Sequence, residues 1–125
     1  MHVVLIVEDD QGIQDVLRIL AEVNGMRVVA ASTCERAMRA AECHRPDLAI
    51  VDLGLPDRDG IELIRYIRTW SHLPIIVLSA RTFWSNRNAA FEAGADEYLS
   101  KPFSAPELLE RMQALLHRGA SHGAD

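Results

Sequence analysis

The sequence predicts a doubly wound α/β fold, in which helices cover both faces of one parallel sheet. Short apolar segments alternate with amphipathic segments along the whole chain, which is the pattern of repeated βα units. The 125 residues are enough for one domain with a single sizeable core. Hydrophobic residues make up 49% of the chain and charged residues 25%, as in ordinary globular proteins.

Five segments fit buried parallel strands, because they are short, apolar and mostly β-branched. They are residues 3–7, 28–31, 48–51, 75–78 and 97–99. The first, third and fourth are apolar throughout, so we expect them at the centre of the sheet. Five right-handed βα units in one open sheet give the flavodoxin-like strand order 2-1-3-4-5. That order places ligand sites at the carboxyl ends of strands 1 and 3.

Five helices are expected to alternate with these strands. Apolar residues at helical spacing indicate one buried face of the first helix: Ile13, Val16, Leu17 and Leu20. The later helices are expected at about residues 33–44, 61–69, 85–93 and 105–118. Residues 104–107 form a capping box with proline in the first turn, and Gly94 can close the fourth helix. The domain is therefore expected to span residues 1–118. The small, polar residues 119–125 are expected to be loose, as a linker start or the end of an expressed fragment.

The charge and hydropathy of the chain argue against two kinds of partner. A formal net charge of -5 does not suit a surface that neutralises nucleic-acid phosphates. The apolar run at residues 3–7 is far shorter than the roughly 20 residues of a membrane span. We therefore expect a cytoplasmic location, no membrane contact, and no DNA binding by this domain itself.

The cysteines and histidines offer no separate site. Cys34 and Cys43 lie nine residues apart in one predicted helix, too far for a disulfide, so we expect both to be reduced packing residues. The histidines lack the spacing of metal ligands and are expected at the solvated surface. They are His2, His44, His72, His117 and His122.

Carboxylates follow two of the predicted central strands. Glu8, Asp9 and Asp10 come directly after the first strand, and Asp52 follows the third. Like charges this close are costly unless a cation lies among them. A hard divalent ion such as Mg²⁺ meets this need, with Mn²⁺ or Ca²⁺ as alternatives.

Two further polar residues are expected at the same edge of the sheet. Ser79 ends the fourth strand, and Lys101 follows the fifth. An Asp in such a site can attack phosphorus to form an acyl phosphate, while a metal and a lysine offset charge on the transferring oxygens. The set therefore predicts phosphoryl chemistry at Asp52.

Each residue also has a simpler interpretation. Asp10 could only favour the dipole of the helix that follows it. Asp52 could be a turn residue before residues 53–56, and Ser79 a helix cap. Their joint placement at strand ends favours the functional interpretation. The Lys101–Pro102 bond is a candidate for the cis form, because cis bonds concentrate at X–Pro in tight turns.

Four motifs contain the site residues and their neighbours: LIVEDD at residues 5–10, DLAIVDLGLPD at 47–57, IVLSAR at 76–81 and AGADEYLSKPF at 93–103. With these motifs the chain resembles, over residues 2–118, the response-regulator receiver domains of bacterial two-component systems. The resemblance implies that Asp52 is the phosphoacceptor. It also implies that Asp9 and Asp52 bind the metal directly, Glu8 through water, and Gly54 through its carbonyl.

The same resemblance implies a switch. Ser79 would be the hydroxyl that moves toward the phosphoryl group, Tyr98 the aromatic residue that rotates inward behind it, and Lys101 the cation that contacts phosphate. In that family the Lys-Pro bond is cis. Such a domain is a signalling phosphoacceptor and not an enzyme in the usual sense, with only self-catalysed phosphoryl transfer and slow autodephosphorylation. Its phosphoryl donor would be a sensor histidine kinase.

The chain is most similar to the subfamily with a C-terminal winged-helix domain, and within it to potassium-transport regulators. DNA would then be bound only by a domain outside this sequence. The resemblance implies a homodimer when phosphorylated, formed by the fourth helix, fifth strand and fifth helix. The expected pairs are Arg87 with Glu107, Glu97 with Arg111 and Asp96 with Arg118. Apolar contact would come from Phe91 and Leu109.

Two features depart from the family pattern. Phe83 and Trp84 are aromatic where relatives usually have polar residues, and they could be exposed or folded into the core. Asn88 takes a position that is usually aliphatic, which would weaken the dimer.

Other protein classes fit less well. A phosphatase with an Asp nucleophile needs a second acid where Gly54 stands, and a flavodoxin needs a phosphate loop where residues 8–10 are acidic. A nucleotide-hydrolysing switch needs a Gly-x-x-x-x-Gly-Lys loop, which the sequence lacks. The remaining alternative is a receiver-like interaction module that is not phosphorylated.

Overall fold

Five parallel strands form one sheet in the order β2-β1-β3-β4-β5, in a computed structural model that describes residues 1–81 and 83–124. The strands are β1 (Val3–Val7), β2 (Arg27–Ala31), β3 (Leu48–Val51), β4 (Ile75–Ser79) and β5 (Glu97–Ser100). The helices are α1 (Gln11–Val23), α2 (Cys34–His44), α3 (Gly60–Arg68), α4 (Trp84–Ala93) and α5 (Ala105–Ala124). The predicted doubly wound fold and its strand order are confirmed.

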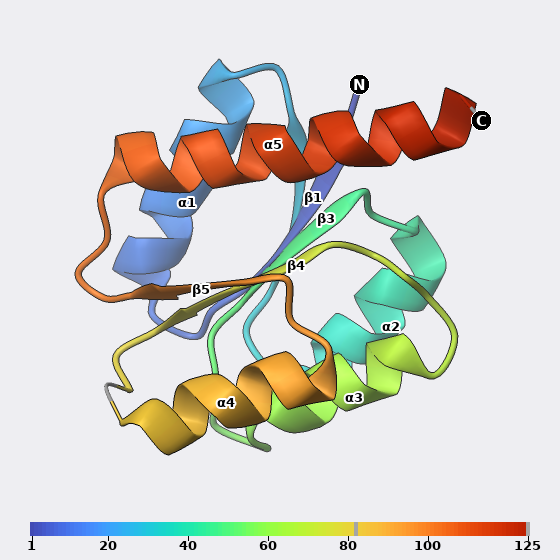
Figure 1. The fold of residues 1–125 in the computed structure, drawn as a ribbon. Helices are drawn as coiled ribbons and strands as arrows, with labels where there is room; N and C mark the ends of the chain where they lie inside the picture. The colour runs from blue at the N-terminus through green and yellow to red at the C-terminus, as the bar shows by residue number, and fades with distance from the viewer. Residues whose placement is uncertain (82, 125) are drawn as a thin grey trace.

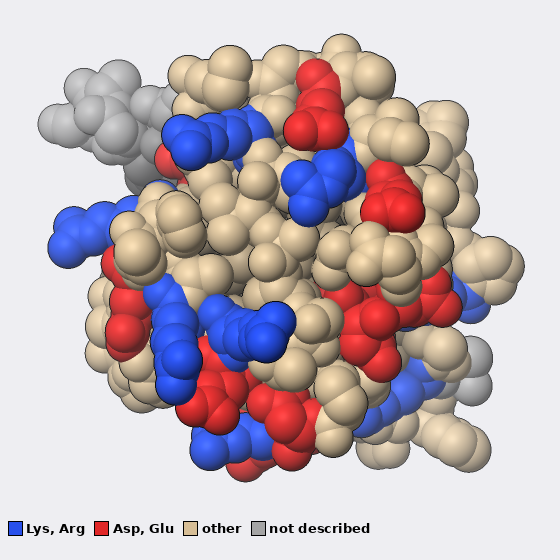
Figure 2. Space-filling view, turned by 180° about the vertical axis from the view of Figure 1, so that it is seen from behind, with Lys and Arg blue, Asp and Glu red and all other residues tan. Residues whose placement is uncertain are grey.

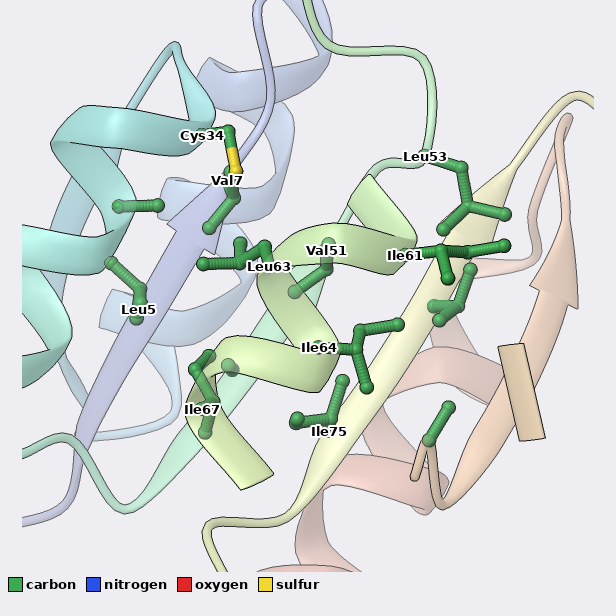
Figure 3. Close-up of a cluster of buried hydrophobic side chains, with 14 of the residues drawn as sticks. Leu5, Val7, Cys34, Val51, Leu53, Ile61, Leu63, Ile64, Ile67 and Ile75 are labelled. Carbon is green, nitrogen blue, oxygen red and sulfur yellow. The ribbon is translucent and has the colours of Figure 1, made fainter. Parts of the chain in front are cut away.

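The sheet separates two hydrophobic cores. Helices α1 and α5 cover one face, and α2, α3 and α4 cover the other (Figure 1). Because side chains alternate along a strand, neighbours in β1 enter different cores: Ile6 packs with α1 and α5, whereas Leu5 packs with α2 and α3. Figure 3 shows the second core, where Leu63, Ile64 and Ile67 of α3 lie among side chains of β1, β3 and β4. Both faces of the central strands are therefore buried.

Side chains cap four of the five helices at their N-termini. The oxygen atoms of Asp10, Thr33 and Asp59 accept N–H groups in the first turns of α1, α2 and α3 at 3.0, 3.1 and 3.0 Å. Ser104 Oγ accepts the Glu107 N–H at 3.3 Å, as the predicted capping box requires. Helix α4 begins after its N-cap residue Phe83, whose side chain makes no capping hydrogen bond. Gly94 closes α4 with φ of 122°, as predicted.

The predicted inner face of α1 is partly wrong. Leu17 is buried and both Ile13 and Leu20 are partly buried, but Val16 is 50% exposed. Gln14 lies on the buried face instead, because its side-chain amide donates to the Glu8 carbonyl at 2.9 Å. That hydrogen bond satisfies a polar group at a position where spacing alone favoured an apolar one.

Two other expectations change. Cys34 is buried, and burial raises the pKa of its thiol to about 11, but Cys43 is exposed and is not a packing residue. Helix α5 continues to Ala124, so the helix end predicted at residue 118 is too early. The domain boundary at residue 118 stays a prediction.

The surface charges and the helices of the described residues are as follows. On the face shown in Figure 2, Lys and Arg side chains are interspersed with Asp and Glu side chains, whereas nucleic-acid-binding surfaces gather their basic residues. Within residues 1–81 and 83–124, no helix combines the length and apolar character of a membrane span.

Candidate metal and phosphoacceptor site

Three carboxylates converge at the carboxyl ends of β1 and β3. Oxygen atoms of Glu8, Asp9 and Asp52 all lie within 4.8 Å of one another. The pairing of Val7 with Val51 in adjacent parallel strands brings about this approach, because the next residue of each strand leaves the sheet at the same edge. Glu8 and Asp52 are buried, while Asp9 is exposed. The predicted acidic cluster is therefore present.

Backbone hydrogen bonds hold the two buried carboxylates in place. The N–H of Glu8 donates to the Ala31 carbonyl at 3.0 Å, and the N–H of Asp52 donates to the Val7 carbonyl at 2.9 Å. The side chains are also held, since Asp52 Oδ1 accepts the Gly54 N–H at 3.2 Å and Glu8 Oε2 accepts the Asp10 N–H at 3.1 Å. Both side chains thus keep a fixed orientation, as a ligand site requires.

Lys101 provides the positive charge within this cluster. Its Nζ lies 2.7 Å from Glu8 Oε1 and 3.5 Å from Asp52 Oδ2, and its side chain is only 16% exposed. Burial alone would lower the pKa of Lys101, but the hydrogen bond to Glu8 and the charges of Asp52 and Glu8 raise it above its ordinary value. Lys101 is therefore a fixed ammonium beside Asp52. The Lys101–Pro102 bond is cis, as predicted.

The remaining charge of the cluster is negative. Burial raises the pKa of Glu8 above its ordinary value, and the nearby Asp52 acts in the same direction, although Lys101 and the Asp10 N–H oppose them. One lysine does not balance the carboxylates of Glu8, Asp9 and Asp52. A hard divalent cation prefers oxygen ligands such as these, so the donor set fits such an ion.

Ser79 and Tyr98 meet at the loop that follows β4. Ser79 is buried at the end of β4, and its Oγ accepts the Arg81 N–H at 3.0 Å. Tyr98 is also buried, and its hydroxyl donates to the Arg81 carbonyl at 2.8 Å. Both predicted switch residues therefore contact the same residue, Arg81.

Sequence reasoning missed two residues that shape the phosphoacceptor loop. A Cβ at Gly60 would lie 2.4 Å from the Asp52 carbonyl oxygen, so only glycine allows this close approach. Asp57 accepts the N–H groups of Cys34 and Glu35 at 2.8 and 3.0 Å, which ties the loop to the start of α2. The Asp59–Gly60 pair before an apolar run was a possible signal for the close approach at Gly60. Nothing in the sequence indicates the contact of Asp57 with α2, because it joins residues far apart in the chain.

The predicted dimer face has its own ion pairs within one chain. Arg111 lies 2.9 Å from Glu97 and 3.7 Å from Glu107, and Arg118 lies 3.5 Å from Asp96. Asp96 also accepts Arg68 at 3.1 Å. Two of the three pairs expected between protomers are therefore formed inside the protomer.

Arg87, the remaining cation of that face, lies against aromatic rings. Its guanidinium carbon is 5.9, 5.4 and 5.9 Å from the ring centres of Trp84, Phe91 and Tyr98. Phe83 and Trp84 are 76% and 71% exposed, so they are surface residues and not core. Asn88 is exposed as well.

Comparison with protein families agrees with this geometry. The sequence model of the family described as the response regulator receiver domain matches residues 4–113 of this chain. The chain belongs to the response regulator receiver domain family. The acidic cluster of this receiver domain is the site expected for phosphorylation and divalent-cation binding, and the protein is a signalling protein.

Individual relatives refine this placement. The receiver domain is 55% identical over 115 residues to the KDP operon transcriptional regulatory protein KdpE of Escherichia coli (strain K12), covering 92% of this chain and 51% of KdpE. It thus spans about half the length of that relative. The predicted likeness to potassium-transport regulators is confirmed.

Solved receiver structures share the fold closely. One is the receiver domain of a Pseudomonas aeruginosa PAO1 sensor histidine kinase with a magnesium ion coordinated in the active-site cleft (TM-score 0.85, 33% identity, 93% of this chain and 98% of that one). Another is the BeF3-activated N-terminal receiver domain of Klebsiella pneumoniae RstA (TM-score 0.87, 29% identity, 91% and 97%).

Proposed function

We propose that this receiver domain accepts a phosphoryl group on Asp52 from a sensor histidine kinase. The observation that supports this most directly is the convergence of three carboxylates on one another, with the Lys101 ammonium 3.5 Å from Asp52. A carboxylate oxygen of Asp52 would attack phosphorus while the bond from phosphorus to the donor nitrogen breaks. The product is an acyl phosphate on Asp52.

The neighbouring residues would stabilise the transferred group. Lys101 is close enough to Asp52 to turn from Glu8 toward phosphoryl oxygens. Asp9 and Asp52 would hold a divalent cation, most simply Mg²⁺, with Glu8 acting through water and Gly54 through its carbonyl. When bound, such a cation offsets negative charge on the transferring oxygens. The Ser79 hydroxyl is the group that would answer the new charge, with Tyr98 behind it.

A direct test uses acetyl phosphate as the phosphoryl donor and mass spectrometry as the readout. The parent domain with Mg²⁺ should gain one phosphate, and the gain should disappear after chelation of the metal. Asp52→Asn should gain none while keeping its fold. Asp15→Asn, at an exposed Asp of α1 outside the cluster, is the matched control and should be modified normally. Modification of Asp52→Asn at the parent level would reject the assignment, and no modification of the parent domain would favour an unphosphorylated interaction module.

We further propose that phosphorylation promotes a homodimer through α4, β5 and α5, which would control a DNA-binding domain outside this sequence. Among the described residues, no carboxylate lies within 4.0 Å of Arg87, so its pairing with Glu107 of a second protomer is the new ion pair available. Exposed pairs contribute only about 0–1 kcal/mol each, so the dimer should be weak and salt-sensitive. The unphosphorylated domain should be a monomer.

The cytoplasmic location stays a prediction.

Sedimentation of the beryllofluoride-bound domain tests this dimer. Arg87→Glu should abolish association, and the added Glu107→Arg change should restore it. Failure of the double reversal to restore association would exclude the pairing and leave Glu107 with its capping and Arg111 contacts alone.

A further inference from the structure

Arg81 connects the two loops that flank Asp52. Its guanidinium lies 2.9 Å from Asp59 Oδ2 and donates a hydrogen bond to the Leu53 carbonyl at 3.2 Å. Leu53 directly follows Asp52, and Asp59 ends the same loop as the N-cap of α3. The Arg81 side chain is 31% exposed, so solvent reaches it only in part. The guanidinium is thus a bridge from the β4–α4 loop to the β3–α3 loop.

The main chain of Arg81 contacts both residues of the proposed switch. Its N–H donates to Ser79 Oγ, and its carbonyl accepts the Tyr98 hydroxyl. Because the acceptor for Tyr98 is a backbone carbonyl, its position depends on where the β4–α4 loop lies. Any contact that fixes this loop therefore also fixes the anchor for Tyr98.

Among the described residues, local structure does little to fix that loop. The N-cap residue of helix α4, Phe83, makes no side-chain capping hydrogen bond, and Ala90 is the buried residue of the helix. Phe83 and Trp84, which follow Arg81 closely in the chain, are exposed. Within the described residues, the β4–α4 loop is joined to the β3–α3 loop by side-chain hydrogen bonds of the Arg81 guanidinium. These are its two contacts with Asp59 and Leu53.

We propose that Arg81 is a positioning residue for the switch, and that its bridge to Asp59 and Leu53 holds Tyr98 inward before any phosphoryl group is bound. The link to phosphorylation rests on the proposed function, whereas the position of Tyr98 in the unmodified domain does not. A domain that already populates the inward state needs less differential binding energy from the phosphoryl group to complete the change. Arg81 thereby sets how readily the domain is activated.

Fluorine NMR of the unmodified domain labelled with 3-fluorotyrosine tests the first part. The chain has two tyrosines, so the Tyr66→Phe variant leaves Tyr98 as the single reporter. Arg81→Ala keeps the backbone carbonyl but removes the bridge, and the Tyr98 signal should move toward that of an exposed tyrosine with a larger solvent isotope shift. Asp59→Asn keeps the cap acceptor of α3 and removes the charge, so it should act in the same direction but less. Arg81→Lys should restore part of the parent signal.

The matched control is Arg58→Ala. Arg58 is an exposed arginine on the β3–α3 loop, and no carboxylate of the described residues lies within 4.0 Å of it. The Tyr98 signal of Arg58→Ala should equal that of the parent domain. Urea unfolding of each variant checks that the protein is folded under the conditions of the NMR measurement. An unchanged Tyr98 signal in both Arg81→Ala and Asp59→Asn would overturn the inference.

A titration with beryllofluoride and Mg²⁺ tests the second part. Loss of a partly exposed ion pair should raise the half-saturating concentration of Arg81→Ala about fivefold. Asp52→Asn should not respond, and a normal response there would reject the proposed function without affecting the result in the unmodified domain. Equal half-saturation of the parent domain and Arg81→Ala would overturn the claim that Arg81 sets the ease of activation.

Discussion

Helices α3 and α4 lie on the same face of the sheet, but they are held in very different ways (Figure 1). Helix α3 has a side-chain cap from Asp59 and buries five of its nine residues. Among the described residues, helix α4 has no side-chain cap, and it buries Ala90 alone. Elements with few buried contacts open at lower free energy than well-packed ones. The domain therefore places a firmly held helix after Asp52 and a loosely held helix after Ser79.

The loops that precede these helices differ in the same sense. The β3–α3 loop is tied to α2 by Asp57, capped by Asp59, and packed against Gly60. The described part of the β4–α4 loop depends mainly on Arg81. A phosphoacceptor needs a fixed site, whereas a switch needs a part that can move. The α3 side meets the first need, and the α4 side meets the second.

The largest expected effect comes from the core of α3. Ile64 is fully buried, so Ile64→Ala should lower the free energy of unfolding by about 3 kcal/mol, since it removes buried methyl groups and leaves a cavity. Ile64→Val should cost only about 1 kcal/mol. In α4, Ala90→Gly should cost about 1 kcal/mol, close to the helix-propensity difference. Urea unfolding measures all three, and a similar loss for Ile64→Ala and Ala90→Gly would contradict the comparison.

The next effect concerns the close approach at Gly60. A methyl group there meets backbone atoms of Asp52 and Leu53 at 2.4 and 2.8 Å, and backbone cannot move aside cheaply. Gly60→Ala should therefore cost about 2 kcal/mol of unfolding free energy and reduce beryllofluoride binding. Gly54→Ala is the stability control, because a Cβ at that position meets nothing within 4 Å. If both alanines are equally well tolerated, the phosphoacceptor loop is less rigid than its contacts indicate.

A smaller change should make α4 more like α3. Phe83→Asp would supply the missing N-cap at a side chain that is 76% exposed, so little burial is lost. We expect a gain of about 1 kcal/mol in unfolding free energy and slower hydrogen exchange in α4. Asp59→Ala should cost α3 about the same amount. Unchanged exchange rates in α4 would show that the cap is not what limits its stability.

The smallest expected effect is the pH dependence contributed by Asp57. The N–H groups of Cys34 and Glu35 hold the pKa of Asp57 below its ordinary value, with Cys34 as the main cause. A lowered pKa stabilises the fold above the pKa of the unfolded chain, about 4, and this contribution is lost as the pH falls through the lower folded value. Asp57→Asn should therefore show a shallower fall in stability below about pH 4. Identical acid profiles for the two proteins in urea unfolding would exclude this role.

Local patterns were enough to predict most of the fold. Strand positions agree within one residue at each end, because buried parallel strands are nearly continuous apolar runs bounded by polar residues. The carboxylate cluster was also predictable, since the residues after β1 and β3 must leave the sheet at one edge. Both predictions depend on regular geometry and not on detailed packing.

What the sequence could not predict depends on contacts between distant segments. Gln14 is buried in place of Val16 because of one hydrogen bond to Glu8, and periodicity contains no information about that bond. The bridges of Asp57 to α2 and of Arg81 to Asp59 join loops more than twenty residues apart. Exposure of Phe83 and Trp84 likewise depends on which surfaces α4 can reach, so local sequence does not determine it.

The division of each central strand between two cores has a consequence for insertions and deletions. In β3, Ala49 and Val51 face one core while Leu48 and Ile50 face the other. One residue added or removed inside β3 would exchange these sets and turn Asp52 to a different side of its strand end. Substitutions of similar volume in β3 should therefore be tolerated far better than any change of length. Length variation among natural homologues should be confined to the loops and to the solvent side of the helices.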